Sequence, residues 1–170
     1  MIRDVIRGVA SGAVATVAMS AAMVAGERAG LMKGGHPPKR LARAFLPGHK
    51  RRPKPGEGVL GAVAHIGFGA AAGGLFAAVA DPRRARVPVG VLYGLAIWAV
   101  SYQGWVPRLG VVPPIHRDHP ERQAVMAAAH VIYGAALAAA LSRLRAGALP
   151  KVPEPAREPS IPVGETLTAH

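Results

Sequence analysis

Hydrophobic residues are concentrated in four runs that contain no Asp, Glu, Lys or Arg. The runs cover about residues 8–26, 58–80, 87–106 and 123–142. A helix of about 20 residues crosses the roughly 30 Å hydrocarbon core of a bilayer. A chain of 170 residues has little other material that could bury four such helices in a water-soluble core. The pattern therefore predicts an all-α, multi-pass membrane protein with four transmembrane helices.

The polar segments divide the chain into a transmembrane domain over residues 1–147 and a tail over residues 148–170. Prolines and mixed charges fill the tail, which predicts disorder. Within the loop over residues 27–57, the stretch 38–46 fits a short interfacial helix and an irregular solvated loop equally well. Two arginines ahead of the first run would also fit a signal peptide. We expect this run to be retained, because it is longer than a usual signal-peptide core and has an internal counterpart.

The second half of the chain repeats the order of features in the first half. Residues 65–71 and residues 130–136 both follow the pattern His-x-x-(Phe/Tyr)-Gly-Ala-Ala. The hydrophobic run that precedes each of these motifs has two glycines four residues apart, and the loop after that run has a Pro-Pro pair. These residues are Gly8, Gly12 and Pro37-Pro38 in the first half and Gly90, Gly94 and Pro113-Pro114 in the second. We interpret this order as a duplicated two-helix hairpin. Because each unit contributes two spans, both copies would point the same way across the membrane.

Small residues recur at four-residue spacing along the runs, which places them on one face of each helix. Helices in lipid gain little from hydrophobic burial and associate through close backbone approach over small side chains. We therefore expect these rows to form the helix–helix contacts of a tight bundle. The glycines predicted at the contacts are Gly8, Gly12, Gly61, Gly69, Gly73, Gly90, Gly94 and Gly134.

The formal net charge of +12 would suggest nucleic-acid binding in a soluble protein. Here Lys and Arg lie in the loops and tails that flank the runs, where they meet anionic lipid headgroups. No aromatic residues alternate with the basic clusters, so nucleic acid is not expected as a partner. The chain has no cysteine, which excludes disulfides and zinc–thiolate sites. Because basic residues flank both ends of the runs, their distribution leaves the orientation open.

Two ionisable side chains lie inside the runs, His65 in the second and His130 in the fourth. Such residues are costly in a bilayer and indicate a functional site or an interhelical hydrogen bond. Three interpretations stay open: neutral imidazoles that bond neighbouring helices, a proton- or ion-responsive pair, and a haem or divalent-metal site. No spacing matches a dedicated metal motif such as HExxH. The candidate contributors from the flanking loops are Glu57, Glu121, His116 and His119.

The third run ends in an aromatic cluster with Tyr102 and Trp105, typical of an anchor at the membrane interface. Residues 102–110 read Y-Q-G-W-V-P-R-L-G, and a Pro pair and residues 130–134, H-V-I-Y-G, follow. In these motifs the chain resembles small, uncharacterised inner-membrane proteins of bacteria, loosely similar to the YagU-like family. The resemblance covers about residues 5–145. It implies four spans and a bacterial cytoplasmic membrane, and it transfers no functional residue.

The serines of the runs lack a nucleophile elbow and acid–base neighbours, so the sequence does not indicate catalysis, although active residues could still converge from loops. We predict a non-enzymatic integral membrane protein without a cofactor. It would be a scaffold or a conduit for a proton, an ion or a small solute. The alternative is a redox subunit that binds haem or a divalent metal at His65 and His130. The expected partners are the lipid bilayer and either further copies of the chain or another membrane protein.

Overall fold

The computed structural model describes residues 1–31, 56–80, 86–108 and 115–147, and every regular element in these ranges is a helix. The all-α prediction is confirmed for this part of the chain. The Pro-Pro pairs, the stretch 38–46 and the tail lie outside the described residues. The elements are α1 (Ile2–Arg28), α3 (Glu57–Val79), α4 (Val87–Val100), the π-helix η1 (Ser101–Trp105), α5 (Val106–Arg108), the 3-10 helix η2 (Ile115–Arg117) and α6 (Pro120–Ala146).

Three helices, α1, α3 and α6, are long and apolar enough to cross a membrane, judged by length and composition. They match three of the four predicted runs. The third run is helical but less regular than expected. Its first 14 residues form α4, and the π-helix η1 and the short α5 then continue the helical path to Arg108. A π-helix is rare and occurs often at functional sites.

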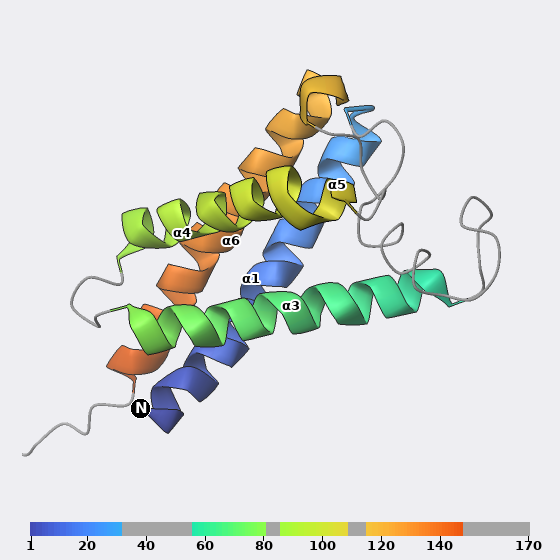
Figure 1. Cartoon of the computed structure of the whole chain (residues 1–170). Helices are drawn as coiled ribbons and strands as arrows, with labels where there is room; N and C mark the ends of the chain where they lie inside the picture. Colours follow the sequence, from blue (N-terminus) through green and yellow to red (C-terminus); the bar gives the residue numbers. More distant parts are fainter. Residues whose placement is uncertain (32–55, 81–85, 109–114, 148–170) are drawn as a thin grey trace, which may run out of the picture.

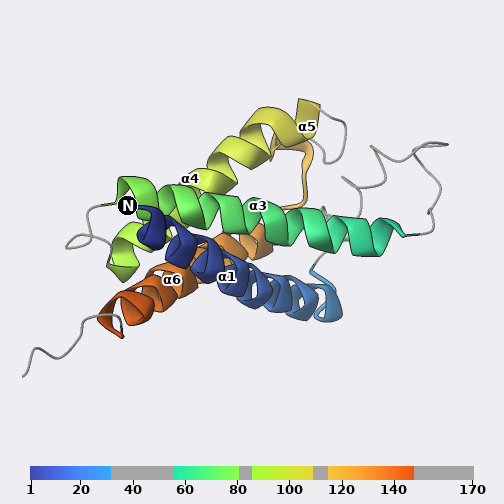
Figure 2. The same cartoon turned by 90° about the horizontal axis from the view of Figure 1, so that it is seen from below.

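The helices form two layers that cross at an angle (Figures 1 and 2). One layer holds α3 and α4, and the other holds α1 and α6. α1 packs along both α3 and α6, and α6 also packs against α4, whereas α3 and α4 touch much less. The starts of α1 and α4 and the ends of α3 and α6 gather at one end of the bundle (Figure 1). Successive long helices therefore run in alternating directions.

Glycines form the contact between α1 and α3. Gly8 lies against the backbone at Gly73, and Gly12 lies against the backbone at Gly69. A Cβ added at any of these four positions would overlap a carbonyl oxygen of the opposite helix or the hydroxyl of Thr16. Two backbones can approach this closely only where side chains are absent. All eight glycines predicted at helix contacts are buried, which agrees with the spacing argument.

The same kind of contact joins α4 to α6. Gly90 lies against Gly134, and a Cβ at either would overlap the carbonyl of the other. In the sequence alignment of the two halves, Gly12 corresponds to Gly94 and Gly69 corresponds to Gly134. In the structure Gly69 meets Gly12, whereas Gly134 meets Gly90, so the two contacts differ by one helical turn. The packing thus recurs in a shifted register, and the duplication stays a prediction.

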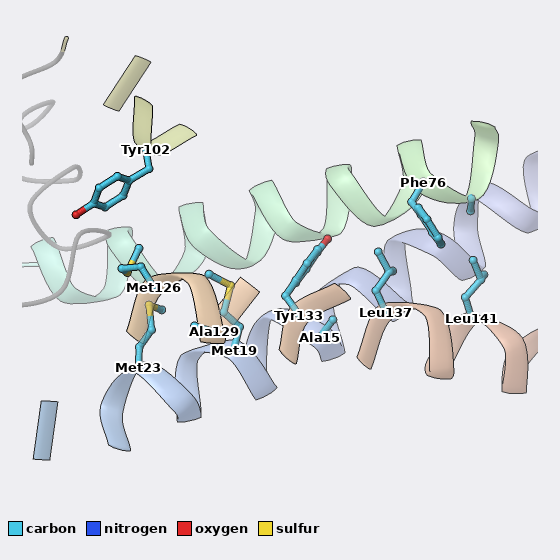
Figure 3. Packing of buried hydrophobic residues seen from close by; sticks show 11 residues of the cluster. Ala15, Met19, Met23, Phe76, Tyr102, Met126, Ala129, Tyr133, Leu137 and Leu141 are labelled. Atoms are coloured by element: carbon cyan, nitrogen blue, oxygen red, sulfur yellow. The ribbon is translucent and has the colours of Figure 1, made fainter. Parts of the chain in front are cut away.

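Larger apolar side chains fill the space between α1 and α6 (Figure 3). At one end of this row Leu137 and Leu141 of α6 are completely buried, with Phe76 of α3 beside them. At the other end the row consists of methionines, which are flexible and leave irregular space. The buried row contains Ala15, Met19 and Met23 from α1 and Met126, Ala129, Tyr133, Leu137 and Leu141 from α6.

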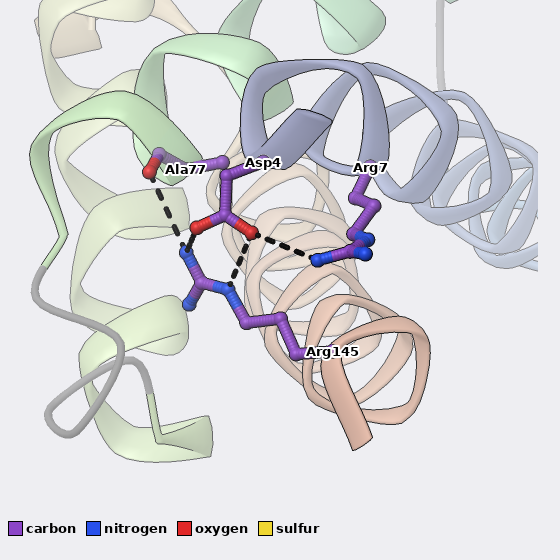
Figure 4. A network of polar contacts seen from close by, with 4 residues as sticks. All are labelled: Asp4, Arg7, Ala77 and Arg145. Carbon is purple, nitrogen blue, oxygen red and sulfur yellow. Dashed lines mark hydrogen bonds and ion pairs between the residues drawn. The ribbon is translucent and has the colours of Figure 1, made fainter. Parts of the chain in front are cut away.

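An ion pair closes the end of the bundle where α1 begins (Figure 4). The Arg145 guanidinium of α6 donates to both oxygens of Asp4, at 2.7 and 3.3 Å, and Arg7 approaches the same carboxylate at 3.4 Å. Arg145 also reaches the Ala77 carbonyl of α3 at 3.5 Å. The contacts therefore join α1, α3 and α6. Hydrogen bonds from Arg145 hold the pKa of Asp4 below its ordinary value of 3.8.

We expect the contribution of this pair to depend on pH. Because the folded pKa of Asp4 is lowered, the pair stabilises the fold fully at pH values well above the ordinary pKa of 3.8. The stabilisation is lost as the pH falls through the lowered folded pKa. Arg145→Gln should lower the free energy of unfolding by up to about 1 kcal/mol at neutral pH, since the pair is partly exposed. Thermal unfolding at several pH values should show that the stability difference between Arg145→Gln and wild type becomes smaller as the pH is lowered. Arg143→Gln, an exposed residue of the same turn, is the control, and a pH-independent difference for Arg145→Gln would contradict this account.

A second ion pair lies at the opposite end, between Asp118 and Arg122 at the start of α6. The Asp118 side chain is 0% exposed and that of Arg122 is 3% exposed. Arg122 donates through Nε to Asp118 at 3.0 Å and through its terminal nitrogen to the other carboxylate oxygen. The His119 backbone N–H donates to Asp118 at 2.9 Å, and the Gln123 side chain donates to the Asp118 carbonyl at 3.1 Å. This buried network fixes how the chain enters α6.

Candidate functional site

A cavity of about 260 Å³ lies inside the bundle, with walls from all four long helical segments. Three methionines and the aromatic rings of α3, α4, η1 and α6 supply most of the wall. The polar groups are hydroxyl, indole and imidazole, and no Asp, Glu, Lys or Arg of the described residues lines the space. Its volume is just below the roughly 300–1,000 Å³ of sites for drug-sized ligands. The cavity is therefore suited to a small, uncharged guest.

His130 lies on the wall of the cavity in α6 and is 7% exposed. Its Nδ1 lies 2.7 Å from the Met126 carbonyl one turn earlier. Because a carbonyl can only accept, Nδ1 must carry the proton, and in a neutral imidazole Nε2 then carries the lone pair. The His130 carbonyl itself lies against Gly94 of α4. The backbone thus fixes both the tautomer of the ring and the position of its helix.

His65 lines the same cavity from α3 and is partly buried. Its Nε2 is buried and has no hydrogen-bond partner among the described residues. The two imidazoles are close enough for a positive charge on one to repel a positive charge on the other. The structure therefore brings the two histidines from the sequence analysis to one site.

Two polar groups of the cavity wall were not predicted from the sequence, the Trp98 indole and the Tyr102 hydroxyl. Neither has a hydrogen-bond partner among the described residues, although both polar atoms are buried. The ring centroids of Trp98 and Tyr102 lie 5.8 Å apart. Tyr102 is only 3% exposed, so its assignment to an interfacial anchor is wrong. It lies in the π-helix η1.

Tyr133 lines the cavity and Tyr93 does not, and the hydroxyl groups of both have partners. Tyr133 of α6 donates to the Gly69 carbonyl of α3 at 2.7 Å, and Figure 3 shows its hydroxyl pointing to that helix. Tyr93 of α4 donates to the Ala72 carbonyl of α3 at 2.8 Å. Glycine at position 69 leaves its carbonyl accessible to the phenol. These bonds hold α3 across from α4 and α6 without a close helix–helix contact.

The candidate contributors from the loops do not line the cavity. Glu121, His116 and His119 are exposed around the start of α6, and Glu57 lies in the first turn of α3. Within the described ranges no group of three or more His, Cys, Asp or Glu side chains could hold a metal ion. The structure thus places these four residues outside the cavity wall, and their contribution to a site stays a prediction.

We expect the two histidines to be energetically coupled. Residues that share one site commonly show coupling free energies of about 0.5–3 kcal/mol, whereas independent ones add within about 0.5 kcal/mol. A double-mutant cycle with His65→Ala and His130→Ala, followed by thermal unfolding in detergent, measures this quantity. The control cycle pairs His65→Ala with Ser142→Ala, because Ser142 is exposed near the other end of α6. Additivity in the histidine cycle would mean two separate structural residues.

The fold and the cavity define a class, a bundle of long apolar helices with a polar site inside it. The chain belongs to a family of unknown function, DUF6789, whose family model matches residues 2–151. The matched region contains every helix described above. The comparison with curated proteins gave no match, and neither did the comparison with solved structures. These findings fit an integral membrane protein of unknown function, and the YagU-like resemblance stays a prediction.

Proposed function

We propose that the chain crosses the membrane four times and binds a small solute in the cavity between its helices. The helical path from Val87 to Arg108 supports a fourth crossing, because its length of roughly 30 Å matches the hydrocarbon core. The alternating directions of α1, α3, α4 and α6 agree with it. The bacterial cytoplasmic membrane as location rests on the sequence resemblance alone.

The observation that carries solute binding is the buried hydroxyl of Tyr102, which lines the cavity without a partner among the described residues. Buried polar groups in proteins are hydrogen-bonded in the great majority of cases, and each exception calls for an explanation. A guest in the cavity would supply the missing partner for Tyr102, for the Trp98 indole and for His65. A scaffold without a ligand gives no reason to keep three such groups around one space.

The cavity can be tested with naphthalene, an apolar probe of suitable size. A ligand that binds only the folded state at ten times its Kd adds about 1.4 kcal/mol to the free energy of unfolding. We expect naphthalene to raise the unfolding temperature of the purified protein in detergent. Ala72→Leu, which fills the cavity wall, should abolish the shift, and Ala71→Leu, exposed on the same helix, should keep it. An equal shift in all three proteins, or none in wild type, would contradict the proposal.

A second candidate, a redox subunit that binds haem or a divalent metal, has one observation in its favour. Ligating histidines usually donate their other ring N–H to a carbonyl or a carboxylate, and His130 donates to Met126 in this way. A haem is larger than most guests of a cavity of about 260 Å³ and would need the helices to move apart. An absorbance spectrum and elemental analysis of the purified protein separate the two. A Soret band or stoichiometric metal would favour the redox subunit over the solute site.

A further inference from the structure

We infer that the guest is an uncharged, mostly apolar molecule with a hydroxyl group. We infer also that it enters from the bilayer between α3 and the segment formed by α4 and η1, past Phe68 of α3 and Trp105 of η1. This inference rests on the proposed function and names the ligand class and route for the same cavity.

The polar atoms of the cavity specify a hydroxyl group. The Trp98 indole can only donate a hydrogen bond, so the guest must offer an acceptor. His130 has its proton on Nδ1, so its Nε2 can only accept while the ring is neutral, and the guest must also offer a donor. A hydroxyl group is the smallest group that does both. The second lone pair of that hydroxyl can accept a further hydrogen bond, from the Tyr102 hydroxyl.

The remaining wall excludes a charged guest. Met19, Met23 and Met126 face the same space with Phe68 and Ile97. Among the described residues no side chain with a formal charge lies there to neutralise an ion. Moving an unpaired charge from water into such surroundings costs several kcal/mol. An uncharged molecule that already dissolves in lipid meets no such barrier.

The contacts between α3 and α4 indicate the entrance. These helices pack less closely than the other neighbouring pairs. They meet through the rings of Phe76 and Tyr93 and through the bond from Tyr93 to Ala72, and beside the cavity Phe68 of α3 meets Trp105 of η1. Phe68 and Trp105 line the cavity, yet they are 48% and 39% exposed, so they lie at its rim. Their ring centroids are 6.4 Å apart. Two apolar rings on the outer face of a membrane bundle would meet lipid, and a rotation of either would open the space.

Three probes of one shape test the ligand class: 1-naphthol, naphthalene and 1-naphthalenesulfonate. We expect 1-naphthol to bind wild-type protein in lipid nanodiscs about five- to tenfold more tightly than naphthalene, as one net hydrogen bond allows. The sulfonate should not bind. Tyr102→Phe should remove most of the advantage of 1-naphthol and leave the naphthalene affinity unchanged. Tyr93 does not line the cavity, and its hydroxyl already donates to the Ala72 carbonyl. Tyr93→Phe should therefore keep the advantage.

The outcomes distinguish a failure of the proposed solute site from a failure of the inferred ligand class. If neither neutral probe binds, the proposed function itself fails. If naphthalene and 1-naphthol bind equally, or the sulfonate binds as tightly, the cavity is a binding site but the ligand class inferred here is wrong.

The route is tested by the rates of binding. Because the chain has no cysteine, Phe68→Cys and Trp105→Cys can be joined by a short bis-maleimide in an otherwise unmodified protein. The bridge should slow association and dissociation of 1-naphthol at least tenfold while Kd changes less than twofold. Each single cysteine capped with a monofunctional maleimide is the control. Trp105→Ala, which removes one ring without a linker, should speed both rates. Unchanged rates in the bridged protein and in Trp105→Ala would exclude this entrance.

Discussion

Gly134→Leu is expected to disrupt the bundle more than any substitution at an outward-facing glycine. A side chain at this position would collide with the Gly90 carbonyl and with the Cα of Val91. Overpacking of a core that can adjust costs about 1–3 kcal/mol. Here the obstacle is backbone, which cannot rotate away, so α4 has to separate from α6. We expect a loss of more than about 3 kcal/mol in the free energy of unfolding.

Gly67 provides the matched control, because a Cβ there would meet open space in the middle of α3. Gly67→Leu should leave stability unchanged or raise it by up to about 1 kcal/mol, since glycine is a poor helix former. Gly69→Leu, two residues further on, should resemble Gly134→Leu because its Cβ would overlap the Thr16 hydroxyl. Thermal unfolding of the three variants in one detergent makes the comparison. Similar midpoints for Gly67→Leu and Gly134→Leu would refute the glycine contacts.

Asp118→Ala is expected to be the most damaging change outside the glycine contacts. It would leave the buried Arg122 guanidinium without the carboxylate that now accepts two of its hydrogen bonds. Removal of one partner from a buried pair costs about 3–5 kcal/mol, because the remaining charge stays desolvated. Thermal unfolding should show this loss, and hydrogen exchange should show early opening of the first turn of α6. Glu121→Ala, an exposed acidic residue of the same turn, should change stability by less than about 0.5 kcal/mol. A loss for Asp118→Ala no larger than this would contradict a buried, essential pair.

The helices could be predicted from the sequence because charge-free length and four-residue spacing are local properties. The runs around Gly12 and Gly134 are helical, and their small residues lie at helix–helix contacts. Helices in lipid associate chiefly through close backbone approach over small residues, so this outcome follows from the spacing. The partner of each glycine could not be predicted. A shift of one turn keeps every glycine on the same face, and only the three-dimensional packing selects the Gly90 carbonyl as the group that lies directly against Gly134.

The candidate site was predictable in part. His65 and His130 stood out because an imidazole inside an apolar run has few structural explanations. Tyr102 did not, because aromatic residues near the end of a run usually mark the membrane interface. In the structure it lies in a π-helix and lines the cavity, and π-helices have no reliable sequence signal. Glu57 and Glu121 were assigned by closeness along the chain to the two histidine-bearing helices, and they lie outside the cavity wall.

The accessibility of single cysteines distinguishes a bundle that crosses the membrane four times around the cavity from one with fewer crossings. Because the chain has no cysteine, one can be placed in turn at Ile2, Gly56, His116 and Gly147, which are all exposed. A membrane-impermeant maleimide is then applied to sealed vesicles. The account predicts that Ile2 and Gly147 label alike, and that Gly56 and His116 both label in the opposite way. If the path from Val87 to Arg108 does not cross, His116 will label like Ile2 and Gly147 will label like Gly56, and the four-crossing bundle is wrong.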